Sequence, residues 1–179
     1  KLIKKLPPSK YSIANSAASL QTKKTHYDMV RLGAALYGIN RLENKSLNLK
    51  QAVKLQSEII QIRWVKTNST VGYGATYKTT EKTKLATIPV GYADGYPRAL
   101  GNIASVYVEN DFAPIVGRIS MDLIVINITK ISAKIGSKVI LFGGPIDIDS
   151  LAKSAGTISY ELITRLSSRY PRIYFNSEK

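Results

Sequence analysis

The chain has 179 residues, 44% of them hydrophobic, which suits one domain or one and a half small ones and excludes wholesale disorder. It contains no cysteine, so disulfides, thiolate metal sites and cysteine nucleophiles are excluded, and a single histidine excludes both a His-based metal cluster and a Ser-His-Asp triad. With 26 Lys and Arg against 12 Asp and Glu, the formal charge of +14 favours an anionic partner such as nucleic acid, an acidic membrane or a phosphorylated ligand. Plain solvation explains the charge equally well.

The first forty residues contain two short units of similar pattern. The segment 11–16 predicts a strand that delivers Asn15 and Ser16 to a loop, followed by a helical turn. The segment 29–38 repeats this order, with a strand that carries Arg31 and then Gly33 and small residues. Residues 39–50 are polar and form the predicted linker. The chain begins with Lys1 and lacks a signal peptide, which indicates a fragment or a processed chain.

Beyond the linker the pattern predicts short strands. Apolar residues alternate from 53 to 64 with one slip at Glu58 and Ile59, where we expect a bulge. In the strand 84–90, Pro89 indicates a sheet edge or a strand end. Further strands are predicted at 104–108, 114–118, 123–128 and 138–142, the first two forming a hairpin around residues 109–111. Short strands at this spacing are typical of a small barrel or sandwich.

Two helices are predicted near the end of the chain. Asp147 or Asp149 is a suitable cap for a helix that runs to Ala155 and closes at Gly156. Thr157 is the predicted cap of a second helix, which ends before Pro171. Its apolar face would contain Leu162, Ile163, Leu166 and Tyr170.

Several loop residues are candidates for chemistry. Ser16 and the turn at Gly33 and Ala34 offer a hydroxyl and accessible backbone amides, as in a phosphate site, although ordinary packing turns explain them as well. Arg31 lies in an apolar strand and needs either a salt-bridge partner or a ligand.

Three further turns combine glycine with polar or aromatic side chains. Tyr73 lies between two glycines, which would expose its hydroxyl for proton transfer. Tyr92 precedes Asp94 in a second glycine-flanked turn, and Met121 and Asp122 stand at a strand junction. Each signal is weak by itself.

Five ordered motifs together resemble the C-terminal half of the bacterial alanine racemases. They are IANSAA (13–18), MVRLGAALYG (29–38), GYGATY (72–77), IPVGYADGYPR (88–98) and APIVGRISMD (113–122). The resemblance implies a mainly β fold: residues 1–40 would be the last βα units of a (β/α)8 barrel that binds pyridoxal 5'-phosphate, and residues 41–179 the β-barrel-like C-terminal domain. The boundary agrees with the polar linker.

The resemblance also implies a role for each candidate residue. Ser16 and the backbone of Gly33 and Ala34 would bind the cofactor phosphate, with Asn15 beside them. Arg31 would face the pyridine nitrogen and keep it unprotonated, because arginine retains its own proton. Tyr73 would be one of two bases in the interconversion of L- and D-alanine, acting in the partner subunit of a homodimer. Backbone atoms of Met121 would contact the substrate carboxylate, with Asp122 and Tyr92 at the entrance.

The chain departs from the family pattern at several places. The lysine that binds the cofactor covalently belongs to an upstream stretch, and no lysine here stands in that context. We therefore expect an incomplete C-terminal fragment that is inactive by itself. Ser12 stands where many relatives have histidine, and Ser168 where some have a phosphate-contacting tyrosine, so that Ser168 or Tyr170 could make this contact. A serine-using relative could share every motif.

The expected setting is a cytoplasmic enzyme that supplies D-alanine for peptidoglycan, with no metal and no membrane. Two other interpretations remain open. One is a catalytically inactive remnant or dimerisation domain. The other is a basic β-barrel that binds single-stranded nucleic acid through tyrosine stacking and phosphate contacts, although the aromatic residues lie in glycine-flanked turns.

Overall fold

The structure of the chain is a computed structural model that describes residues 7–39 and 49–175. It divides into two compact units, Lys1–Val53 and Lys54–Lys179. We call them unit 1 and unit 2 and describe each by itself. Among the described residues, no helix is both long and apolar enough to cross a membrane.

Unit 1 contains short helices joined by extended segments. Helix α1 (Ser16–Gln21) begins at Asn15, whose side chain accepts a hydrogen bond from the amide of Ala18. The 3-10 helices η2 (Lys23–Thr25) and η3 (Ala34–Tyr37) follow. The predicted strands at 11–16 and 29–33 are not regular strands, and this prediction was wrong. The segments do run side by side, joined by hydrogen bonds from Asp28 to Tyr11 and from Arg31 to Ala14, but two bonds do not make a regular ladder.

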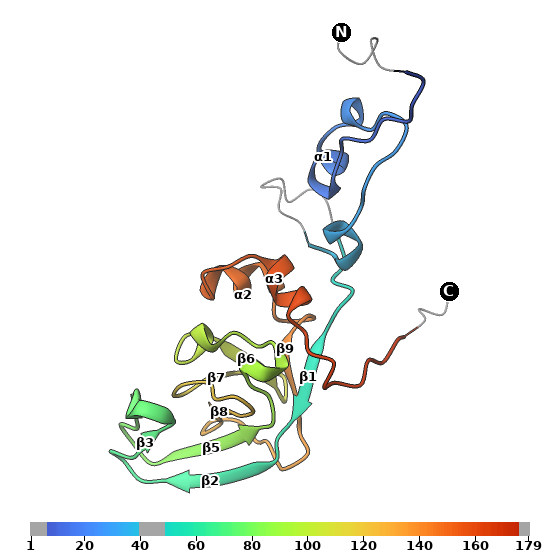
Figure 1. Cartoon of the computed structure of the whole chain (residues 1–179). Helices are drawn as coiled ribbons and strands as arrows, with labels where there is room; N and C mark the ends of the chain where they lie inside the picture. Colours follow the sequence, from blue (N-terminus) through green and yellow to red (C-terminus); the bar gives the residue numbers. More distant parts are fainter. Residues whose placement is uncertain (1–6, 40–48, 176–179) are drawn as a thin grey trace. The chain divides into compact units, whose positions relative to one another are not determined.

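Unit 2 is built from antiparallel strands. The first sheet has the order β1-β9-β6-β7 and the second the order β2-β5-β8, while β3 and β4 form a separate pair. The strands of the first sheet are β1 (Leu55–Glu58), β9 (Lys138–Phe142), β6 (Ser105–Val108) and β7 (Asp111–Pro114). Those of the second are β2 (Gln61–Val65), β5 (Thr83–Ile88) and β8 (Ile124–Asn127), and the pair is β3 (Thr70–Val71) and β4 (Tyr77–Lys78). The mainly β class expected from the sequence is confirmed for this unit (Figure 1).

Two details of the strands differ from the prediction. At Ile59 and Ile60 the chain does not bulge but passes from the first sheet to the second, since β1 pairs with β9 and β2 pairs with β5. The β6–β7 hairpin has a two-residue turn in which Glu109 and Asn110 both have positive φ. This tight turn starts β7 at Asp111, so the strand predicted at 114–118 begins and ends earlier.

The helices of unit 2 come late in the chain, as predicted. Helix α2 (Ile148–Ser154) begins after Asp147, which accepts a hydrogen bond from the amide of Ser150, and Gly156 follows it with a φ of 72°. Helix α3 (Ser159–Thr164) is capped by Ile158 and not by Thr157, whose hydroxyl instead donates to Glu161. It ends before Leu166 and Tyr170, so the predicted longer helix was wrong. Both helices lie together at one end of the strands of unit 2 (Figure 1).

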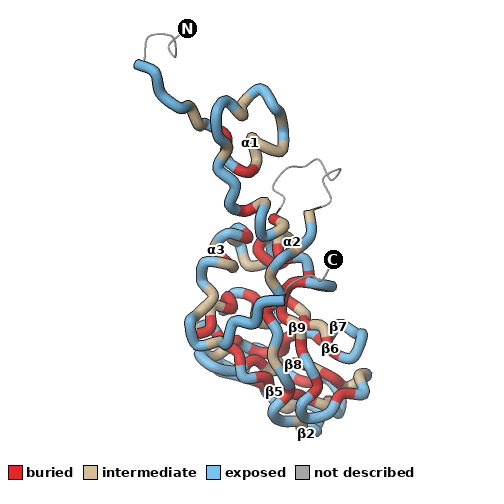
Figure 2. The backbone as a smooth tube through the Cα atoms, turned by 90° about the vertical axis from the view of Figure 1, so that its right-hand side faces the viewer, coloured by how far each residue is buried: buried red, intermediate tan, exposed pale blue. Residues whose placement is uncertain are grey.

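The core of unit 2 lies among its strands. Burial alternates along β6 and β8, while central β5 is buried at most of its positions, as expected for a strand with neighbours on both sides. Figure 2 shows the buried residues gathered along these strands. Pro89 follows the last residue of β5, so it marks a strand end and not a sheet edge. Three 3-10 helices connect the strands, namely η4 (Tyr73–Ala75), η5 (Tyr92–Asp94) and η6 (Arg98–Leu100), and the first two carry candidate residues.

Candidate functional site

The candidate phosphate site of unit 1 is a cluster of one hydroxyl and two backbone amides. The Ser16 hydroxyl oxygen accepts hydrogen bonds from the amides of Gly33, at 2.9 Å, and Ala35, at 3.3 Å. Ser16 and Ala34 are both buried, and a Cβ at Gly33 would meet no atom within 4 Å. Because the hydroxyl oxygen accepts both amides, its own hydrogen is left to donate to a phosphate oxygen beside this open space. The second amide that donates to Ser16 belongs to Ala35, and the expected contact of the Ala34 backbone with a phosphate stays a prediction.

Arg31 lies close to this cluster in the chain and is exposed. One guanidinium nitrogen donates to the backbone oxygen of Ser12 at 2.8 Å and to the Ser12 hydroxyl at 3.0 Å. The backbone amide of Arg31 bonds to the oxygen of Ala14, which fixes the segment that carries the side chain. Ser12 thus provides two acceptors for Arg31. No ion pair of Arg31 is found among the described residues, and its other guanidinium donors can bind a ligand.

In unit 2, Tyr73 begins the 3-10 helix η4 and is 73% exposed. Gly72 and Gly74 both have positive φ, 75° and 71°, a conformation that side chains disfavour. A Cβ at Gly74 would stand 3.0 Å from a guanidinium nitrogen of Arg118, so this arginine lies against the turn. One pocket is lined by residues that include Tyr73, Arg63, Arg118 and Ser120. The exposed Tyr73 expected from the sequence therefore shares its pocket with two arginine side chains that the sequence did not indicate.

The turns that carry Tyr92 and Met121 are packed backbone to backbone. The amides of Tyr92 and Ala93 donate to the oxygens of Ser120 and Met121, at 3.1 and 3.0 Å. A Cβ at Gly91 would stand only 2.1 Å from the Met121 oxygen, so glycine is required for this approach. The side chains of Tyr92 and Met121 are both about half exposed. The structure thus brings together two of the predicted substrate residues.

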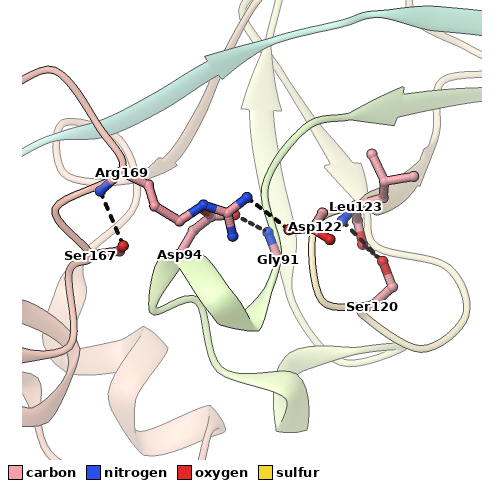
Figure 3. Close-up of polar contacts among 7 residues, drawn as sticks. All are labelled: Gly91, Asp94, Ser120, Asp122, Leu123, Ser167 and Arg169. Atoms are coloured by element: carbon pink, nitrogen blue, oxygen red, sulfur yellow. Dashed lines mark hydrogen bonds and ion pairs between the residues drawn. The ribbon is translucent and has the colours of Figure 1, made fainter.

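Asp122, the third predicted substrate residue, is held by the guanidinium group of Arg169. Its carboxylate accepts a hydrogen bond from Arg169 at 2.8 Å, and the same guanidinium lies 3.5 Å from Asp94 (Figure 3). The hydrogen bond to Asp122, followed by the charge of Asp94, raises the pKa of Arg169. Burial, followed by the negative charge of Asp94, raises the pKa of the Tyr170 hydroxyl. Neither Arg169 nor its two partners could be paired from the sequence, because they lie far apart in the chain.

The predicted site residues therefore form two groups, each within one unit. Unit 1 holds Asn15, Ser16, Arg31, Gly33 and Ala34, and unit 2 holds the others, which are Tyr73, Tyr92, Met121 and Asp122. Ser168 is exposed, and the buried Tyr170 hydroxyl has no hydrogen-bond partner among the described residues. The choice between these two for a phosphate contact stays open.

Comparison with known proteins identifies the family of the chain. Residues 52–174 match the family "Alanine racemase, C-terminal domain", and residues 1–41 match "Alanine racemase, N-terminal domain". The chain belongs to the alanine racemase family. Members of this family are pyridoxal-phosphate-dependent isomerases. The resemblance inferred from the five motifs is confirmed, and so is the fold class.

Individual relatives are similar along nearly the whole chain. An alanine racemase from Vesicomyosocius okutanii is 43% identical over 90% of this chain and 46% of its own length, and one from Rhodospirillum rubrum is 39% identical over 95% and 46%. The chain thus spans about half the length of the curated relatives it matches. Among solved structures, the alanine racemase of Bartonella henselae, which has covalently bound pyridoxal phosphate, has a TM-score of 0.91 at 37% identity. That comparison covers 97% of this chain and 49% of the other.

Proposed function

We propose that this chain contributes its two groups of residues to an alanine racemase, which interconverts L- and D-alanine with pyridoxal 5'-phosphate. The proposal is carried by two features that occur together in a chain of this family. One is the cluster of the Ser16 hydroxyl and backbone amides, which fits a phosphate. The other is the exposed Tyr73 in a pocket with two arginines. In this proposal the enzyme is cytoplasmic and supplies D-alanine for peptidoglycan.

The residues of unit 1 hold the cofactor. The Ser16 hydroxyl and the backbone of Gly33 and Ala34 would bind its phosphate, and Asn15, which fixes the start of α1, would lie beside them. Arg31, held by Ser12, would face the ring nitrogen and leave it unprotonated, because a guanidinium does not release its proton in this pH range. When bound, pyridoxal phosphate stabilises the negative charge that develops at the Cα atom of alanine.

The residues of unit 2 act on alanine. Tyr73 removes or returns the proton of the Cα atom on one face, while a lysine outside this chain serves the opposite face. Inversion at one carbon requires such a pair of proton carriers on opposite faces. Arg63 and Arg118 line the same pocket as Tyr73 and bring positive charge to it. The backbone of Met121 binds the substrate carboxylate, and Tyr92 and Asp122 lie at the entrance.

We further propose that the enzyme is a homodimer in which Tyr73 acts in the site of the partner subunit. A mixing experiment with the protein at its natural length tests the whole proposal. Tyr73→Phe and Arg31→Met are each expected to abolish D-alanine formation when assayed alone. After subunit exchange between the two variants, half of the dimers are mixed, and each of these has one intact site, so about a quarter of the wild-type rate returns.

A Tyr107→Phe variant, altered in β6 of the first sheet at a residue of neither group, is the matched control and should keep the wild-type rate. Failure of the mixture to regain activity would contradict the shared site. An inactive wild-type protein, supplied with pyridoxal phosphate and alanine, would contradict the proposed function itself and favour the inactive remnant.

A further inference from the structure

The segment that follows α3 returns to the candidate substrate turns of unit 2. The amide of Ser167 donates to the backbone oxygen of Asp94 at 3.3 Å, and its hydroxyl accepts from the amide of Arg169 at 3.1 Å. Arg169 then reaches both carboxylates, with Nη2 at 2.8 Å from Asp122 and Nε at 3.5 Å from Asp94. Figure 3 shows the guanidinium between the turn that begins at Gly91 and the loop from Ser120 to Leu123.

The two carboxylates differ in their surroundings. Asp94 is 4% exposed, and its second oxygen accepts the amide of Gly91 at 2.8 Å, so this buried charge depends on its partners. The side chains of Asp122 and Arg169 are both about half exposed. Exposed ion pairs contribute little to folding. The bond between Arg169 and Asp122 therefore adds little to the free energy of folding. Its main effect is to fix the position of the loop from Ser120 to Leu123.

That position matters because the loop and the turn are joined directly. The turn 91–94 donates two backbone hydrogen bonds to the oxygens of Ser120 and Met121, and the close approach at Gly91 leaves no room for adjustment. A displacement of Asp122 therefore moves its neighbour Met121. Through the two backbone hydrogen bonds it also moves the turn that carries Tyr92. One guanidinium thus fixes both turns from a third segment of the chain.

We propose that Arg169 is a positioning residue, which holds the Met121 backbone and the Tyr92 turn in the geometry that binds the substrate carboxylate. This inference rests on the proposed racemase function. Since Met121 would bind the carboxylate equally in the ground state and in the transition state, loss of Arg169 should weaken substrate binding without slowing the bound reaction.

The kinetic test compares Arg169→Met and Arg169→Lys in the protein at its natural length. Arg169→Met raises KM for alanine at least about fivefold and changes kcat by less than about twofold. Arg169→Lys recovers most of the loss, because an ammonium group can still pair with Asp122. The matched control is Arg165→Met, which removes an arginine that pairs at 3.3 Å with Glu161 one helical turn away, and it leaves both constants unchanged. A KM of Arg169→Met equal to that of the wild type would overturn the proposal.

A second readout does not depend on activity. In the same protein labelled with [15N]methionine, the Met121 amide signal is identified by its loss in Met121→Leu. Arg169→Met shifts or broadens this signal, whereas Arg165→Met does not, and the signal of Met29 in unit 1 serves as an internal control. A Met121 signal that is unmoved in folded Arg169→Met would also overturn the proposal. If the wild type does not racemise alanine, the proposed function fails, and the methionine signals still decide whether Arg169 holds the loop.

Discussion

Replacement of Gly91 by alanine should destabilise unit 2 through a backbone collision. The new Cβ would stand 2.1 Å from the Met121 oxygen, 2.3 Å from the Met121 carbonyl carbon and 2.4 Å from the Ser120 oxygen. The φ of Gly91 is −148°, which any residue can adopt, so the cost arises from the collision and not from the dihedral angle. Backbone atoms cannot rotate away as a flexible side chain can, and the two turns must separate.

The size of the effect follows from what the separation breaks. Overpacking costs about 1–3 kcal/mol. The hydrogen bonds from Tyr92 and Ala93 to the facing loop contribute about 0.5–1.5 kcal/mol each. We therefore expect the free energy of unfolding to fall by about 2–6 kcal/mol, a large share of the total stability of a domain.

Urea unfolding followed by fluorescence measures this change, because Trp64 is the single tryptophan of the chain and lies in β2 of unit 2. With a slope of about 1–3 kcal/mol per molar urea, the midpoint should fall by at least about 0.7 M. Gly144→Ala is the control: Gly144 has a φ of +61° but no atom within 4 Å of a Cβ, so only the dihedral cost of about 1–2 kcal/mol applies. If Gly91→Ala costs no more than Gly144→Ala, the argument from backbone contact is refuted.

Three further predictions concern other parts of the chain. Tyr96→Phe should leave stability at pH 7 unchanged or raise it, because the buried Tyr96 hydroxyl has no hydrogen-bond partner among the described residues. Burial raises the pKa of Tyr96, so above about pH 10 its hydroxyl loses its proton in the unfolded chain before it does in the folded one, and the wild type loses stability. Thermal unfolding at alkaline pH should show a smaller loss of stability in Tyr96→Phe. Ser16→Ala should weaken pyridoxal-phosphate binding about tenfold or more in a cofactor titration, because a hydrogen bond to a charged group contributes about 1.5–3 kcal/mol. Asp147→Ala should lower the free energy of unfolding by about 0.5–2 kcal/mol through loss of the α2 cap, measured by urea unfolding.

Each of these predictions has an outcome that contradicts it. An alkaline loss of stability that is equal in Tyr96→Phe and in the wild type would assign that loss to other groups. Ser19→Ala is the control for Ser16→Ala, since Ser19 lies in the same helix and its hydroxyl donates to the Asn15 backbone. Equal cofactor affinities of the two variants would contradict the role of the Ser16 hydroxyl. An unchanged unfolding midpoint in Asp147→Ala would show that the cap contributes nothing measurable.

Local sequence signals predicted the local structure well. The alternation at 123–128 and 138–142 places β8 and β9, since period two fixes which side chains enter the core. Asp147 and Gly156 bracket α2, because capping depends on residues a few positions apart. The glycines around Tyr73 predict its exposure, and the structure confirms it.

Long-range pairings could not be predicted in this way. A bulge and a passage between two sheets both interrupt the apolar alternation in the same way, as at Glu58 and Ile59. Only the strands with which β1 and β2 pair show that the chain changes sheets here. The C-terminal helix ends at Thr164 although apolar residues continue to Tyr170, because the segment beyond it turns towards Asp94 and Asp122. Arg169 is separated from Asp122 by 47 residues, and no spacing rule joins them.

The most direct test of the account is the exchange of the alanine Cα proton with solvent deuterium. With pyridoxal phosphate, the wild-type protein at its natural length should racemise alanine and introduce deuterium into both enantiomers. Tyr73→Phe should stop racemisation but still introduce deuterium into one enantiomer, because the carrier on the opposite face remains. Deuterium in both enantiomers at the wild-type rate in Tyr73→Phe would contradict the role of Tyr73 as one of two proton carriers.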